Sequence, residues 1–137
     1  MGYTVELEDA DLRCRSREAA EAAAEIVNAD PWASPYHLQV SPVCRSNPPK
    51  DANWSLEVSH FQGDHWHDDE ARRLWVALAA SLADGATIEF QGEGFERWRI
   101  RWEGGRVFEE YVTEIVWAVA SELTSTPVPP APAKAAP

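Results

Sequence analysis

The stretch that decides the fold is residues 86–123, with the sequence ATIEFQGEGFERWRIRWEGGRVFEEYVTEIVWAVASEL. In its first half apolar and polar side chains alternate strictly, which is typical of half-buried strands. The two alternating runs are separated by Gly92-Glu93-Gly94, which we expect to supply the positive φ angle of a tight turn. The sequence therefore predicts a hairpin over residues 86–103, with these side chains in the core: Ile88, Phe90, Trp98, Ile100 and Trp102.

After Gly104-Gly105 the period of the pattern changes, and polar and apolar residues separate onto two faces of a helix. We therefore predict a helix over residues 107–123. The alternative is a third strand over residues 107–117, because β-branched and aromatic residues are dense there. The polar face of the predicted helix contains Arg106, Glu109, Glu110, Thr113, Glu114, Trp117 and Ser121.

This C-terminal region resembles a family of small uncharacterised bacterial proteins with the loose pattern G-E-x, W-R-[IL], G-x-[VA], then a hydrophobic pair and Trp. The resemblance covers about the last third of the chain, and the opening Met1-Gly2-Tyr3 is also similar. It implies a strand rather than a helix after Gly105, and it implies no activity. The matching segments are Gly92-Glu93-Gly94, Trp98-Arg99-Ile100, Gly105-Arg106-Val107 and Ile115-Val116-Trp117.

Five further elements precede the hairpin. Alternation predicts strands over residues 3–8, 36–41 and 54–60, and helical spacing predicts helices over residues 17–28 and 68–83. Ser16 is a suitable N-cap for the first helix. Its many alanines favour a helix that lies close to a sheet. The segment between the first strand and this helix is predicted to be a polar connection, over residues 9–15.

The predicted element order is β-α-β-β-α-β-β-α. Its first six elements match the ferredoxin-like, or split β-α-β, arrangement. We therefore predict an α+β fold in which an antiparallel sheet has helices on one face and carries an added hairpin strand. Residues 1–123 are predicted to form a single domain. Residues 124–137 are rich in Pro and Ala and are predicted to be a disordered tail.

The formal net charge of this 137-residue chain is −11. Such a charge disfavours nucleic-acid binding, because phosphates would be repelled, and it fits a basic protein partner. The polar face of the predicted sheet also lacks the paired aromatic residues that RNA binding would need. No secretory signal or bilayer-spanning apolar run occurs in the sequence, and Cys14 and Cys44 have no metal-site spacing. We expect a cytoplasmic protein without membrane contact or cofactor.

Residues 60–70 hold the densest group of metal-ligating residue types. His60, Asp64, His65 and His67 could serve zinc or iron, and the H-x-H spacing superficially resembles that of the metallo-β-lactamase superfamily. The chain departs from that family, because it lacks H-x-H-x-D-H and a distant completing histidine. We favour a solvated loop whose aspartates cap the following helix. A metal-binding protein or small metal-dependent hydrolase is the alternative.

Arg97, Arg99 and Arg101 occupy alternate positions of one predicted strand, which places the three guanidinium groups on one face. They could bind an anion such as phosphate or carboxylate. We favour cross-strand pairing with Glu89 and its neighbours, which would fix the register of the hairpin.

The leading hypothesis is a small, acidic, non-catalytic protein-binding module, such as an immunity protein or an inhibitor of a basic partner. No nucleophile motif, phosphate-binding loop or dinucleotide fingerprint occurs in the sequence, so no catalytic residues are predicted. A structural or assembly component of a phage or multi-subunit particle is another alternative. Trp117 lies in line with acids on the predicted helix, either as an interface anchor or in a structural role. The candidate partner-binding residues are Trp117, Glu110, Glu114 and Trp66.

Overall fold

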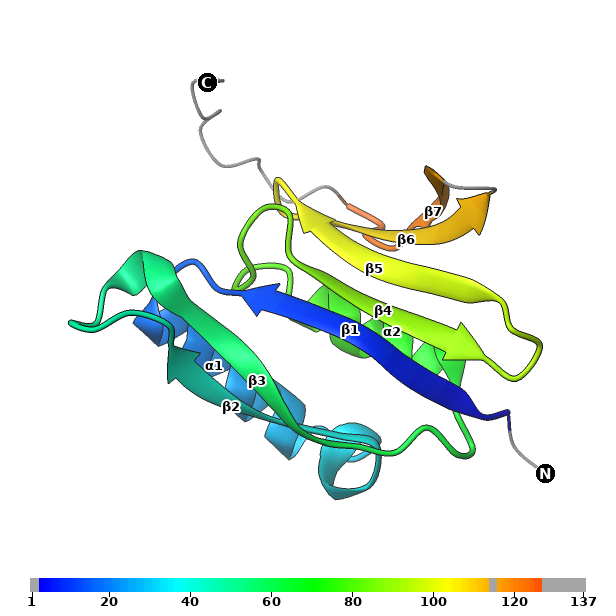
Figure 1. Ribbon diagram of the computed structural model, residues 1–137, viewed down its shortest axis with the longest axis horizontal. Helices are drawn as coiled ribbons and strands as arrows, with labels where there is room; N and C mark the ends of the chain where they lie inside the picture. Colours follow the sequence, from blue (N-terminus) through cyan, green and yellow to red (C-terminus); the bar gives the residue numbers. More distant parts are fainter. Residues whose placement is uncertain (1–2, 114–115, 127–137) are drawn as a thin grey trace.

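The computed structural model describes residues 3–113 and 116–126 (Figure 1). Within them, seven strands form one antiparallel sheet in the order β2-β3-β1-β4-β5-β6-β7. Short helical turns cover Ala33–His37 and Asp51–Asn53. The longer elements are β1 (Val5–Arg13), α1 (Arg17–Ala29), β2 (Leu38–Cys44), β3 (Trp54–Phe61), α2 (Asp68–Ala77), β4 (Thr87–Gly92), β5 (Arg97–Glu103), β6 (Arg106–Thr113) and β7 (Val116–Glu122).

The predicted fold class, a ferredoxin-like α+β domain, is wrong. In the described residues the chain is mostly one seven-stranded antiparallel sheet with few helices. The predicted order β-α-β-β-α-β-β-α fails at its end, because the helix expected over residues 107–123 is replaced by β6 and β7. These two strands pair with each other, with Tyr111 opposite Ala118 and Val112 opposite Trp117. The strand alternative therefore describes residues 107–113 correctly.

Three smaller predictions also need correction. Residues 9–13 are not a polar connection, because β1 continues through them and pairs with β4 beyond an irregularity after Leu7. The second helix ends at Ala77 and is followed by turns rather than by further helix to residue 83. In the hairpin between β4 and β5, the residue with positive φ is Phe95, at 67°.

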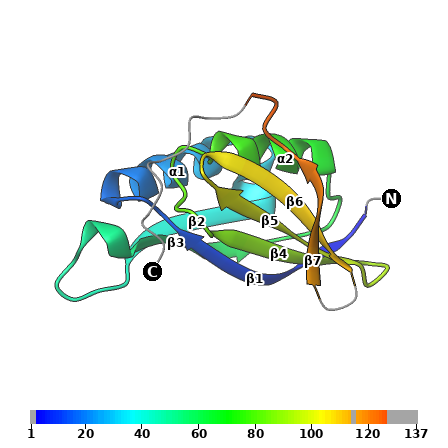
Figure 2. The ribbon, with the colours of Figure 1, turned by 90° about the horizontal axis from the view of Figure 1, so that it is seen from above.

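The first helix forms as predicted, from Arg17 to Ala29. The Ser16 side chain accepts a hydrogen bond from the Ala19 N–H at 3.1 Å, which satisfies one of the free N–H groups at the start of the helix. Four residues of α1 are buried, and the helix packs mainly on β2 and β3. In Figure 2 both helices lie above the sheet.

An aromatic core fills the space beneath α2. The predicted core positions Trp98 and Trp102 are buried, and the Trp102 indole N–H donates to the Trp75 carbonyl at 3.0 Å. The ring of Phe90 lies at centroid distances of 5.3 Å from Trp66, 5.8 Å from Trp75 and 5.7 Å from Trp98. Contacts between aromatic rings at such distances add to the stability gained from burial alone.

The C-terminal end of the sheet continues slightly beyond β7. The Leu123 N–H donates to the Val107 carbonyl at 2.7 Å, and Thr124 is buried. Most of the predicted tail, residues 127–137, lies outside the described residues, so the domain boundary stays a prediction. Neither α1 nor α2, the two longer helices of the described chain, is long and apolar enough to cross a membrane.

Candidate functional site

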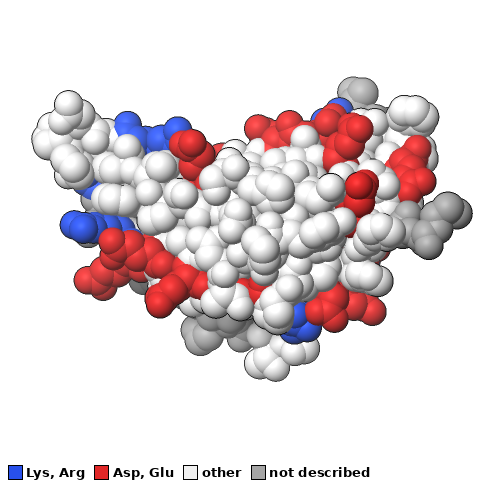
Figure 3. All heavy atoms as spheres, turned by 90° about the horizontal axis from the view of Figure 1, so that it is seen from below, with Lys and Arg blue, Asp and Glu red and all other residues white. Residues whose placement is uncertain are grey.

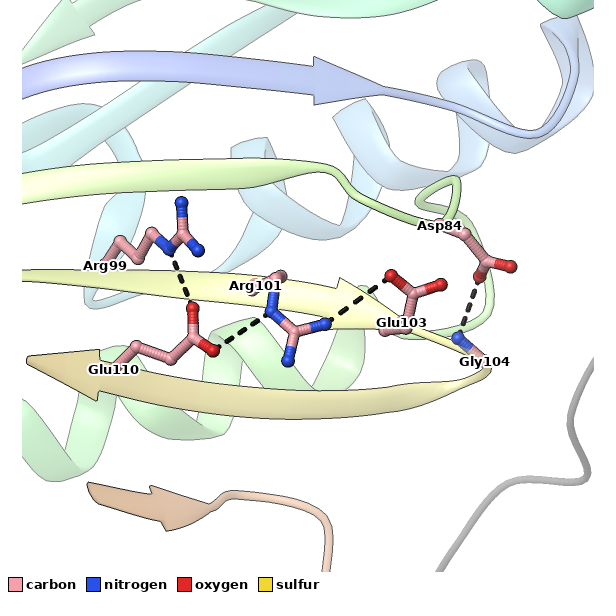
Figure 4. A network of polar contacts seen from close by, with 6 residues as sticks. All are labelled: Asp84, Arg99, Arg101, Glu103, Gly104 and Glu110. Carbon is pink, nitrogen blue, oxygen red and sulfur yellow. Dashed lines mark hydrogen bonds and ion pairs between the residues drawn. The ribbon is translucent and has the colours of Figure 1, made fainter. Parts of the chain in front are cut away.

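The face of the sheet opposite the helices carries an arginine–glutamate cluster (Figure 4). Glu110 of β6 accepts from Arg99 Nε at 2.7 Å and from Arg101 Nε at 3.1 Å, both from the neighbouring strand β5. Only 5% of Glu110 is exposed. Each guanidinium also lies over an aromatic ring, Arg99 at 4.4 Å from the Trp117 centroid and Arg101 at 4.8 Å from that of Phe108.

These contacts locate the three predicted anion-binding arginines. Arg97 lies 3.9 Å from Glu8 and 4.0 Å from Glu89, so the expected cross-strand pairing with Glu89 is made by Arg97 alone. Arg99 and Arg101 instead share Glu110. An anionic ligand would therefore have to compete with a carboxylate that is already in place between the two guanidinium groups.

Two predicted partner-binding residues are placed differently from expectation. Trp117 lies on strand β7, not on a helical stripe, and its half-buried ring packs against Arg99. Glu110 is buried in ion pairs rather than exposed beside Trp117. Glu114 lies outside the described residues. The structure thus gives Trp117 a contact within the sheet, which the helix prediction did not contain.

The histidine loop is not assembled as a metal centre. His60 Nε2 bonds the Tyr36 carbonyl at 2.9 Å, and Asp64 accepts from the Thr4 hydroxyl at 3.3 Å. His65 is exposed in a left-handed conformation, and His67 occupies the N-cap position of α2 that we expected an aspartate to fill. Within residues 3–113 and 116–126, no three His, Cys, Asp or Glu side chains are grouped so that they could hold a metal ion.

The remaining candidate, Trp66, lines a cavity of about 170 Å³ on the helix side of the sheet. Trp66, Trp98 and Glu109 are buried and form its inner wall, whereas the other lining residues are exposed. The walls come from the segment before β1, the loop before α2, the start of α2, the β4–β5 turn and strands β5 and β6. The lining residues are Tyr3, Trp66, Asp68, Glu96, Trp98, Glu109 and Tyr111.

Trp66 is held in this wall by the loop that precedes α2. Its backbone N–H donates to the Tyr3 carbonyl at 2.9 Å, and its indole N–H donates to Asp68 at 3.1 Å. The same loop contacts β1 very closely at Gly63, where an added Cβ would lie 1.6 Å from the Val5 carbonyl oxygen. Only glycine permits this approach, so Gly63 determines how near the loop lies to the sheet.

Glu109 is the buried carboxylate of the cavity. Arg72 of α2 donates to it through Nε at 3.0 Å and through Nη2 at 3.1 Å, and the Tyr111 hydroxyl donates at 3.2 Å. The hydrogen bond with Glu109 raises the pKa of Arg72 above its usual value. Burial, and then the negative charge of Glu109, raise the pKa of Tyr111. At neutral pH, where Arg72 is charged and Tyr111 is protonated, Glu109 therefore accepts three hydrogen bonds, which occupy most of its acceptor capacity.

The cavity has an excess of negative charge. Three carboxylates line it, and one of them, Glu109, is paired with Arg72. Asp68 and Glu96 make no ion pair within the described part of the chain. Proteins use carboxylates together with aromatic rings to hold organic cations. The geometry is therefore that of a candidate cation site.

Comparison with known proteins gives no relative: no family model, no curated protein and no solved structure matches the chain.

Sequence reasoning identified Trp66 but missed the rest of the cavity. The strand alternative for residues 107–117 contained the necessary information, because alternation puts Glu109 and Tyr111 on the same face as Val107. The helix prediction instead put Glu109 on a solvent-facing stripe.

Proposed function

We propose that this chain is a non-catalytic binding module for a basic protein partner. The observation that carries the proposal is the pairing of its own arginines. Within the described residues, most arginines form ion pairs with acids of the same chain, and Arg99 and Arg101 are further fixed by the buried Glu110. These cations are therefore not free for an anionic partner, and the charge presented outward is that of the remaining carboxylates.

Those carboxylates are distributed over the surface. Figure 3, which views the molecule from below Figure 1, shows acidic side chains at several places and fewer basic ones. An acidic surface of this kind attracts a basic partner and raises the association rate, more strongly at low salt. Among the described residues, the exposed acids that make no ion pair include Glu6, Asp9, Glu18, Glu25, Glu57, Asp64, Asp68, Glu93 and Glu96.

The specific function that this charge distribution favours is the neutralisation of a basic toxin or nuclease, as an immunity protein does. Such a module needs a rigid surface and no reaction chemistry. The single antiparallel sheet with its aromatic core supplies that rigidity. The exposed carboxylates then provide selection for basic partners over acidic ones.

The test measures fluorescence anisotropy of labelled nonaarginine, nonaglutamate and a neutral Gly/Ser peptide of the same length with the full chain. We expect binding of nonaarginine alone, with an affinity that falls as NaCl rises from about 50 mM to about 300 mM, because salt screens exposed charges. Equal binding of the neutral peptide, tighter binding of nonaglutamate, or no binding of nonaarginine would contradict the proposal.

A further inference from the structure

We infer that the cavity lined by Trp66 and Trp98 receives the side chain of one arginine of the partner. This inference rests on the proposed function, and it names the recognised group and the place where it binds. The cavity combines an apolar aromatic wall with an excess of carboxylates, and its exposed lining residues, Tyr3, Asp68, Glu96 and Tyr111, form its rim.

The size of the cavity limits the ligand to a single side chain. Pockets for cofactors and drug-sized molecules typically measure about 300–1,000 Å³. At about 170 Å³ this cavity is smaller. It is therefore suited to the end of a long side chain that is presented by a larger partner.

The carboxylates at the rim are the groups that a cation would meet. Glu109 already accepts two hydrogen bonds from Arg72 and one from Tyr111. Asp68 accepts one from the Trp66 indole and retains further acceptor capacity. Glu96 makes no ion pair within the described residues. The incoming cation is thus placed between Asp68 and Glu96, against the aromatic wall.

A guanidinium group fits these surroundings better than the other organic cations found in proteins. It is planar, weakly hydrated and able both to stack on aromatic rings and to donate to a carboxylate through two N–H groups. A lysine ammonium is more strongly hydrated, and a quaternary ammonium cannot donate hydrogen bonds to carboxylates. The protein itself holds one guanidinium beside the cavity through two N–H groups on a carboxylate, that of Arg72 on Glu109.

The experiment uses the smallest probes that carry the recognised group. N-acetyl-arginine methylamide is titrated into the ¹⁵N-labelled full chain, and the indole N–H signals are followed by NMR. We expect the Trp66 and Trp98 signals to shift with a dissociation constant of about 1–10 mM, as suits so small a ligand. The Trp54 signal is the internal control, because Trp54 lies on β3 beside Arg17 and does not line the cavity.

Three related probes define the specificity. We expect the lysine analogue to bind about threefold or more weakly than the arginine probe, the trimethyllysine analogue more weakly still, and the neutral norleucine analogue not to shift these signals. Equal shifts with norleucine would mean that the cavity recognises apolar surface, and this inference would be overturned. Tighter binding of trimethyllysine would likewise overturn the assignment to a guanidinium group.

Matched variants test the two carboxylates. We expect D68N combined with E96Q to weaken the arginine probe about tenfold, which corresponds to about 1.4 kcal/mol. The control combines E18Q with E25Q, which changes the net charge equally at exposed residues of α1 that do not line the cavity and make no ion pair within the described residues. If neither the wild-type chain nor the control binds the probe, while nonaarginine still binds, the cavity assignment fails and the proposed function stands. If the wild-type chain binds neither the arginine probe nor nonaarginine, both the cavity assignment and the proposed function are contradicted.

Discussion

Glu109 and Glu110 are neighbours in β6, and both are 5% exposed, yet the two sides of the sheet surround them with opposite charge. Glu110 points to the open face, where two guanidinium groups share one carboxylate. Glu109 points to the helix side and lines a cavity together with two other carboxylates. Only one guanidinium, that of Arg72, pairs with a carboxylate of this cavity within the described residues.

The difference separates a structural cluster from a candidate binding site. On the open face the two guanidinium groups of Arg99 and Arg101 are matched by the carboxylates of Glu110 and Glu103, and they also stack on Trp117 and Phe108, so the cluster is complete in itself. On the helix side the negative charge of the cavity exceeds the positive, and the buried rings of Trp66 and Trp98 line the cavity beside it. Glu109 and Glu110 are equally buried, so burial does not distinguish a structural carboxylate from one in a candidate binding site. The charges of the side chains around each carboxylate make that distinction.

The largest predicted effect is that of E110Q. Within the described residues it leaves Arg99 without a negative partner and leaves Arg101 with only the exposed Glu103, at 3.5 Å, and we expect the free energy of unfolding to fall by about 2–3 kcal/mol. This loss of stability is smaller than the loss expected from breaking a fully buried ion pair, because the side chains of Arg99 and Arg101 remain 22% and 23% exposed. Urea unfolding of the wild type and of E110Q measures the change in the free energy of unfolding. The control is E103Q, at a carboxylate that is 49% exposed, for which the change should stay within about 0.5 kcal/mol.

The second prediction concerns E109Q, for which we expect a smaller loss of about 1 kcal/mol. Arg72 is 37% exposed, and it also lies 3.5 Å from Asp69, so it keeps both water and a second carboxylate. Removing one negative charge from the cavity also relieves repulsion with Asp68. Urea unfolding of both variants makes the comparison directly, and a loss for E109Q equal to that of E110Q would contradict the difference between the two sides.

The smallest predicted effect is a pH dependence at Tyr111. Burial and the adjacent Glu109 raise the pKa of this phenol in the folded chain. The neutral phenol therefore contributes stability that is fully present below the ordinary tyrosine pKa of about 10 and is lost as the pH rises through the folded pKa. We expect Y111F to lose less stability than the wild type above about pH 10. Urea unfolding at a series of pH values measures the free energy of unfolding of both proteins. An equal decline of this free energy with rising pH in Y111F and the wild type would contradict the prediction.

The sequence was sufficient for the hairpin of β4 and β5. Its strict alternation predicted the buried side of each strand, including Trp98, Ile100 and Trp102, because the side-chain period of a strand is fixed at two residues. The turn was predicted less well, since the residue with positive φ is Phe95 rather than one of the two glycines. Flexible residues permit a turn but do not determine which position takes the unusual angle.

The pattern of polar and apolar residues was misleading for β6 and β7, although the density of β-branched and aromatic residues favoured the strand alternative. The helix prediction treated Glu109 and Glu110 as solvent-facing, although both are buried by ion pairs with residues that come from other elements. A glutamate in water and a glutamate held by arginines look alike in a hydropathy pattern. The cavity was missed for the same reason, because Tyr3, Asp68 and Glu96 meet only after the sheet has formed.

The most direct test of this account measures the affinity of labelled nonaarginine for two double variants of equal net charge. One variant, D68N with E96Q, removes carboxylates of the cavity. The other, E18Q with E25Q, removes two exposed carboxylates of α1 that make no ion pair in the described residues. We predict about tenfold weaker binding by the cavity variant and less than about threefold by the α1 variant, a difference of about 0.7 kcal/mol or more. Equal losses in the two variants would show that binding follows net charge alone and would contradict a cation site at the cavity.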